Sequence, residues 1–137
     1  MAVCKFALAG VLVGLLAVGQ GHAAKKDNAK ARAEAARKVY QGLQKRTRFA
    51  PGGPSGGELF ELLFKWSSRW AEAQAETVTK KRDRLTAWQG HVDRMRDMEE
   101  TAKKLLAGRG LISEYEVTAA TYYRLEAEKK LSEAKRK

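Results

Sequence analysis

Cysteine and histidine are scarce in this 137-residue chain, which contains one cysteine, Cys4, and two histidines, His22 and His91. A single cysteine excludes an intrachain disulfide, so an oxidising compartment would add no covalent stability and packing alone must hold the fold together. The chain is about the size of one small domain.

Long hydrophobic runs are also scarce. Phe6 to Val18 is the one uninterrupted apolar or glycine run, with Lys5 before it and Gly21-His22-Ala23 after it. A positive residue, an apolar stretch and small residues in this order predict a secretory signal peptide. A retained membrane anchor is the alternative, but it needs about 20 apolar residues. Cys4 precedes the run, which argues against a lipoprotein. We therefore expect a cleaved leader at 1–23 and export to the periplasm or cell envelope.

Removal of that leader leaves few side chains that could act as nucleophiles or metal ligands. The remaining chain has no cysteine and one histidine, His91, which we expect to be a packed or half-exposed helical residue. Thiol nucleophiles and multi-histidine metal sites are thereby excluded. Glu99 and Glu100 precede Lys103 and Lys104 by one helical turn, so we interpret them as ion pairs on a solvated face. Gly57 is followed by glutamate where a phosphate-binding loop needs Lys-Ser/Thr. We predict a protein that is not an enzyme and has no catalytic residue, metal, cofactor or small-molecule substrate.

Both prolines, Pro51 and Pro54, lie in one glycine-rich stretch, 50–57, which we expect to be a turn. Before it, residues 24–49 show apolar positions at steps of four and three, which predict a basic, alanine-rich helix. These positions are Ala29, Ala33, Ala36, Tyr40 and Leu43. A stripe of such small residues favours a bulky partner helix.

The span 58–107 has bulky apolar positions at helical spacing, with no proline and only one glycine, Gly90. One part contains Leu59, Leu63, Trp66, Trp70, Ala73 and Thr77; the other contains Leu85, Trp88, Val92, Met95, Met98, Ala102 and Leu105. A single helix of this length would be a rod of about 75 Å. The alternative is a bent helix, because the β-branched run Thr77-Val78-Thr79 favours a bend. The pattern leaves a long helix and a bent one open.

A second turn is predicted at 108–112, where Gly108-Arg109-Gly110 ends the preceding pattern. Ser113 and Glu116 have the spacing of a capping box, and Ile112 and Val117 that of a hydrophobic staple. A helix should therefore occupy 113–135, with Val117, Ala120, Ala127, Leu131 and Ala134 on its apolar side and Glu126 paired with Lys130.

Apolar and polar residues nowhere alternate with a period of two, so we expect no sheet. The predicted fold is all-α, built of antiparallel helical hairpins or a coiled coil. In the long-helix arrangement, 24–49 folds back on the first half of 58–107 and 113–135 on the second half. The aromatic residues Trp66, Trp70, Trp88, Tyr122 and Tyr123 could line a groove, but in a chain this small core positions are favoured.

Acidic residues are too few to balance the basic ones, with 16 Asp and Glu against 27 Lys and Arg. Residues 25–48 hold nine basic residues and two acidic ones, a net of +7. A local positive face attracts acidic lipid headgroups, cell-wall polymers or nucleic acid, and the last is the least expected for an exported protein. The residues we predict for an anionic surface are Lys25, Lys26, Lys30, Arg37, Lys38, Lys45, Arg46 and Arg48.

The C-terminal third resembles a known family. Leu105 to Glu114, with its glycine turn and capping serine, and the Ala/Glu-rich stretch Tyr123 to Leu131 are similar to helical segments of TolC-type outer-membrane efflux proteins. The resemblance implies an envelope location and long helices flanked by shorter ones. The chain is too short for that family's duplicated channel, so neither pore formation nor any residue's role is carried over.

Together these features predict an exported helical protein that works by binding, as an envelope scaffold or an accessory subunit. Its partner would be another protein or a second copy, with self-association through the stripes of 58–107 and 113–135. The alternative is a periplasmic holdase-type chaperone, since small, basic, exported coiled coils can cradle unfolded membrane proteins.

Overall fold

The computed structural model describes residues 17–46, 56–109 and 111–137, and over these residues the chain is helical with no strand. It forms α1 (Ala17–Arg46), α2 (Gly56–Thr77), α3 (Lys81–Arg109) and α4 (Glu114–Arg136). The prediction of an all-α fold is therefore confirmed. Most of the predicted leader, together with Arg48 and most of the proline-containing turn, lies outside the described residues, whereas Ala17 to Ala23 forms the start of α1.

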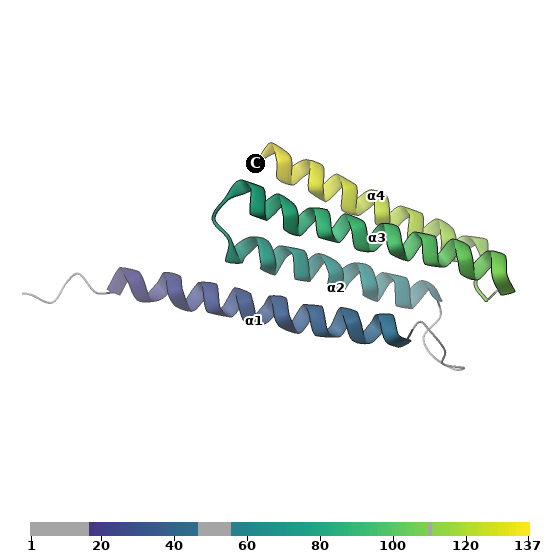
Figure 1. Ribbon diagram of the computed structural model, residues 1–137, viewed down its shortest axis with the longest axis horizontal. Coiled ribbons are helices and arrows are strands. Elements are labelled where there is room, and N and C mark those ends of the chain that lie inside the picture. Colours follow the sequence, from purple (N-terminus) through teal and green to yellow (C-terminus); the bar gives the residue numbers. More distant parts are fainter. Residues whose placement is uncertain (1–16, 47–55, 110) are drawn as a thin grey trace, which may run out of the picture.

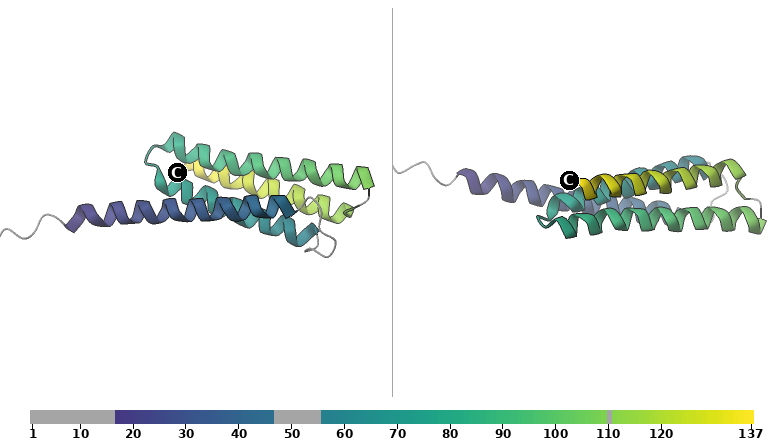
Figure 2. Two further views of the ribbon diagram at one scale, coloured as in Figure 1. Left: turned by 60° about the horizontal axis from the view of Figure 1, so that its bottom comes forward. Right: turned by 90° about the horizontal axis from the view of Figure 1, so that it is seen from above.

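The four described helices run alternately up and down, as the ribbon shows (Figure 1). Consecutive helices pack as α1 on α2, α2 on α3 and α3 on α4, and α2 also contacts α4. Among the described helices, the backbone of α1 approaches only that of α2. Three helices, α2 to α4, therefore form a bundle, and α1 lies along its outside (Figure 2).

The single long helix is wrong, whereas the predicted packing of 24–49 on the first half of 58–107 and of 113–135 on its second half is confirmed by α1 on α2 and α4 on α3. The chain leaves the helix at Val78, Thr79 and Lys80, and α3 then packs back along α2. Side chains compete with the helix here, because Thr77 Oγ1 donates to Gln74 O at 2.7 Å and Arg84 Nη1 donates to Thr79 O at 2.8 Å. Folding back also buries the two bulky stripes against each other, which a straight rod could not do within one chain.

The small stripe of α1 packs on the bulky face of α2, as predicted. Ala29, Ala33, Ala36 and Tyr40 are all buried. Alanine allows close approach of the two helices but contributes little apolar area, so Tyr40 is the main apolar anchor of α1.

The hydrophobic core runs between α2, α3 and α4 and includes that one anchor from α1. Its buried members are Tyr40, Leu59, Phe60, Leu63, Val92, Met95, Met98, Ala102, Ala120, Ala127 and Leu131. Ser67, Ser68 and Ala71 are also buried, although they lie off the predicted stripe. The cause is that α2 has neighbours on three sides, which buries more of its circumference than a two-helix contact would.

The predicted capping box at the start of α4 is confirmed. Ser113 Oγ accepts from the Glu116 amide at 3.3 Å, and Glu116 Oε2 accepts from the Ser113 amide at 2.7 Å. The other Glu116 oxygen accepts from the Gly57 amide at 3.1 Å. Gly56 and Gly57, expected in the turn, instead open α2, and a Cβ at Gly56 would collide with the Glu116 carboxylate. Glycine thus lets α2 begin directly against the cap of α4.

Candidate anionic-surface interface

The predicted binding residues lie on α1. This helix has eight basic and two acidic residues, a net of +6, whereas α3, α2 and α4 carry net charges of +3, −2 and zero. Lys25, Lys26, Lys30, Lys45 and Arg46 are exposed and make no ion pair among the described residues. Helix α1 therefore carries the largest net positive charge of the four described helices.

Three further cations of α1 are already paired. Arg32 forms an ion pair with Glu76 of α2, and Arg37 and Lys38 share Glu34 at 2.9 and 3.8 Å. The hydrogen bond from Arg37 lowers the pKa of Glu34 and in turn raises that of Arg37. Because all of these groups are exposed, their pairing constrains side-chain positions more than it stabilises the fold.

The cations do not share one face, contrary to the expectation of a positive face. Helical periodicity places Lys26, Lys30 and Arg37 together on one flank, while Lys38 and Lys45 lie on the side opposite the buried stripe. An open groove of about 810 Å³ lies along the first flank, between α1 and α2, and Asp27 and Glu34 line it beside Lys30 and Arg37. Charge thus surrounds α1 on every side except the buried one.

The N-terminal part of α1 extends past the end of the bundle (Figure 1). Residues 23–28 are exposed, and Ala29 is the first buried residue in the part of α1 whose side chains the structure describes, 23–46. Cleavage after Ala23 would therefore remove no described buried side chain. Lys25 and Lys26 lie on this extension, where a flat surface could reach them.

A polar cluster lies inside the bundle, where sequence patterns predicted only apolar contacts. Ser67 and His91 are fully buried, with 2.7 Å between Ser67 Oγ and His91 Nδ1, and Arg94 Nε donates to the same Oγ at 2.7 Å. The imidazole tautomer decides which of Ser67 Oγ and His91 Nδ1 donates in this contact, and with it whether His91 Nε2 carries a proton. That Nε2 has no hydrogen-bond partner among the described residues.

Burial sets the charge of this cluster. It lowers the pKa of His91 to about 3, with smaller contributions from the positive charges of Arg94 and Lys130. Burial also lowers the pKa of Arg94 to about 10, and this guanidinium lies 4.0 Å from the centre of the Trp70 ring. At neutral pH the cluster is therefore a cation held by a serine and aromatic faces, beside a neutral histidine that no solvent reaches.

Lys130 forms a second link, between α4 and α2. Its Nζ donates to Ser68 Oγ at 2.7 Å and lies 3.6 Å from Glu72 Oε1. The predicted pair of Lys130 with Glu126 is wrong, since Glu126 instead lies 3.8 Å from Lys129. An open pocket of about 490 Å³ adjoins this link, with Phe64, Arg69 and Tyr123 also on its wall.

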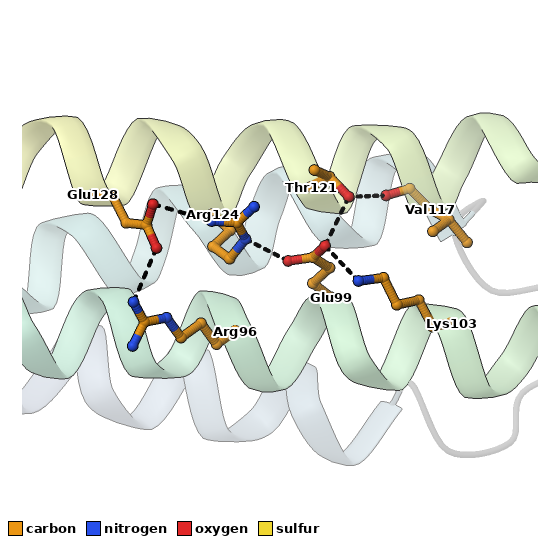
Figure 3. Close-up of polar contacts among 7 residues, drawn as sticks. All are labelled: Arg96, Glu99, Lys103, Val117, Thr121, Arg124 and Glu128. Atoms are coloured by element: carbon orange, nitrogen blue, oxygen red, sulfur yellow. Dashed lines mark hydrogen bonds and ion pairs between the residues drawn. The ribbon is translucent and has the colours of Figure 1, made fainter.

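Glu99 joins α3 to α4 (Figure 3). It accepts from Thr121 at 3.0 Å, from Arg124 at 2.5 Å and from Lys103 at 2.8 Å. Burial raises its pKa, but these three donors together outweigh burial, and the pKa is lowered. The predicted Glu99–Lys103 pair is confirmed, whereas its placement on a solvated face is wrong because Glu99 is only 7 % exposed.

Core packing, which the sequence favoured for the aromatic residues, holds for four of the five. The three tryptophans are half-buried and pack against the core, as does Tyr123, while Tyr122 is 58 % exposed. No described helix is long and apolar enough to cross a membrane. Nor does the described part of the chain group three or more His, Cys, Asp or Glu side chains where a metal could be held.

No family model, curated protein or solved structure matches this chain.

Proposed function

We propose that this chain is an exported helical protein that binds an anionic surface of the cell envelope through α1, while α2 to α4 form its scaffold. The observation that carries the proposal is the net charge of +6 on α1, the largest among the described helices, where five exposed cations form no ion pair with another described residue. Acidic headgroups and acidic cell-wall polymers share the chemistry that would attract them.

The packing is consistent with separate roles for α1, which would bind the surface, and for α2 to α4, which would form the scaffold. Among the described residues of α1, Tyr40 is the one large side chain buried in the core and Leu43 is partly buried beside it, so most of the other large side chains of this helix are exposed. Cations around three sides of a projecting helix can meet a flat polyanion in several orientations. Such attraction is long-ranged at low salt and is screened as salt rises.

The chain beginning at Ala24, the product expected after leader removal, should bind vesicles that contain anionic lipid and not neutral ones. Replacing Lys25, Lys26 and Lys30 by glutamine should weaken binding about 100-fold, at roughly 1 kcal/mol per cation near the surface. Vesicle co-sedimentation over a salt series measures both effects. A parallel series with purified cell-wall fragments distinguishes lipid from polymer as the source of negative charge.

A matched control removes the same charge elsewhere. Lys135, Arg136 and Lys137 are exposed and make no ion pair among the described residues, so their replacement by glutamine leaves α1 intact. This control should retain most of the binding. Equal loss in the two triple variants would show that net charge alone is responsible, and salt-independent retention would contradict the proposal.

A further inference from the structure

The open pocket between α2 and α4 combines aromatic and polar side chains, and no described residue of α1 lines it. The rings of Phe64 and Tyr123 on its wall stack at 5.0 Å between centres. Ser68, which is only 4 % exposed, lines the wall beside them. The charged residues of the wall are Glu61, Lys65, Arg69, Glu72 and Lys130. An apolar surface beside convergent polar groups is the usual form of a small-ligand site.

Two of these charged groups, Lys130 and Glu72, already satisfy each other. Lys130 Nζ donates to Ser68 Oγ at 2.7 Å and lies 3.6 Å from Glu72 Oε1, to which Ser68 Oγ donates at 3.0 Å. The same ammonium lies over the rings of Phe64 and Trp88, 5.5 and 5.8 Å from their centres. These contacts fix the position of Lys130, and Glu72 offsets its charge. One ammonium hydrogen remains to be donated.

Two further cations of the wall have no acidic partner. Lys65 and Arg69 are exposed, lie one helical turn apart on α2, and make no hydrogen bond or ion pair with another described residue. The guanidinium of Arg69 lies over the Trp66 ring, 4.8 Å from its centre. This contact restricts the side chain but leaves its N–H donors without an acceptor among the described residues. Both cations can therefore donate to an anion in the pocket.

Glu61 is the remaining charge of the wall, and it gives the pocket a polarity. It lies eight residues before Arg69 on α2, a rise of about 12 Å. Its carboxylate is near Tyr123, because burial and the negative charge of Glu61 both raise the pKa of that phenol. An anion is therefore favoured toward Arg69, whereas the part of a ligand that lies near Tyr123 should carry no negative charge.

We propose that this pocket binds an organic phosphate with an uncharged apolar body, as a ligand and not as a substrate. The phosphate accepts from Lys65 and Arg69, and the apolar body lies on the rings of Phe64 and Tyr123. An acidic phospholipid and a soluble organic phosphate share this chemistry. The inference goes beyond the binding of α1 to an anionic surface and does not depend on it, because α2 and α4 supply every residue named for the site.

Hexyl phosphate is a suitable probe, since inorganic phosphate and hexanol represent its two halves. Calorimetric titration of the chain beginning at Ala24 should show binding of hexyl phosphate at least about tenfold tighter than that of either half. The double variant Lys65→Gln with Arg69→Gln should weaken binding by about 10- to 100-fold, because hydrogen bonds between charged groups are lost. Circular dichroism verifies that each variant is folded.

The matched control is Lys81→Gln with Arg82→Gln, which also removes one exposed lysine and one exposed arginine, here on α3 and away from the pocket wall. It should retain the affinity of the wild-type chain. Amide chemical shifts locate the ligand, and the changes caused by hexyl phosphate should concentrate at 61–72 and 123–130. Equal loss in the two double variants, equal affinity for inorganic phosphate, shift changes confined to α1, or no saturable binding would each overturn the proposal.

Vesicles that contain phosphatidic acid distinguish the two sources of the phosphate. The chain used for them carries glutamine at 25, 26 and 30, so that α1 contributes less to binding. Vesicle binding that falls with Lys65→Gln and Arg69→Gln, and not with the control pair, would identify a membrane lipid as the ligand. Binding of hexyl phosphate in solution, without such an effect on vesicles, would identify a soluble organic phosphate.

Discussion

His91 is the residue whose surroundings depart furthest from those of an ordinary surface side chain. It is fully buried, shares a hydrogen bond with Ser67 and faces two cations, Arg94 and Lys130. Its pKa is lowered from 6.5 to about 3, mainly by burial. Between these two values the unfolded chain binds a proton that the folded chain does not. The stability linked to His91 is therefore complete above about pH 6.5 and is lost as the pH falls toward 3.

The variant His91→Asn tests this dependence, because asparagine keeps a polar group near Ser67 but cannot titrate. Between about pH 7.5 and about pH 4.5, the wild-type chain should lose about 2–3 kcal/mol more unfolding free energy than the variant, at about 1.36 kcal/mol per pKa unit. Urea unfolding at the two pH values measures the difference. Parallel pH dependence in the two proteins would show that other groups are responsible.

The hydrogen-bond and ion-pair partners of individual buried residues could not be predicted from the sequence. The sequence left His91 as either packed or half-exposed, and it is fully packed, but nothing local indicated Ser67 and Arg94 as its neighbours. Ser67 lies 24 residues from His91, and the two meet only because α3 folds back along α2. Glu99 is a similar case, since its partners Thr121 and Arg124 belong to α4 and only Lys103 lies within reach on its own helix.

At the scale of the element, the start of α4 was predictable because its signal is local. Ser113 and Glu116 satisfy each other within one turn, whatever the rest of the chain does. The break between α2 and α3 was not fixed by its sequence, because β-branched residues disfavour a helix only slightly. The helix breaks there because the break lets the bulky apolar stripes of α2 and α3 bury each other. Such burial depends on the whole fold and not on the local sequence.

Ser113→Ala should lower the unfolding free energy by about 1 kcal/mol, since it leaves the Glu116 amide without its cap. Ser132→Ala is the matched control on the same helix. Ser132 is exposed in the helix interior, where alanine is the better helix former, so this change should be neutral or slightly stabilising. Thermal or urea unfolding compares the two variants. Equal stability of both would mean that the capping box contributes nothing measurable to the fold.

Over the whole molecule, stability is unevenly divided between α1 and the three-helix bundle. The buried surface of α1 is an alanine stripe with one large anchor, Tyr40, which packs on Trp70 at 6.1 Å between ring centres and lies 5.7 Å from Arg94 of α3. A helix attached through so little apolar area should open locally at a lower free energy than the core helices. Such opening would leave α2, α3 and α4 packed on one another.

Hydrogen exchange followed by mass spectrometry should therefore show faster exchange in α1 than in α3. Tyr40→Ala should increase exchange throughout α1, because removal of a buried aromatic side chain costs about 3 kcal/mol, while α3 and α4 should change little. Val39→Ala is the control, since Val39 is the exposed neighbour on the same helix. If Tyr40→Ala instead accelerated exchange equally in all helices, α1 would belong to the same cooperative unit as the bundle. The selective result would mean that the basic helix can rearrange on a surface while its scaffold stays folded.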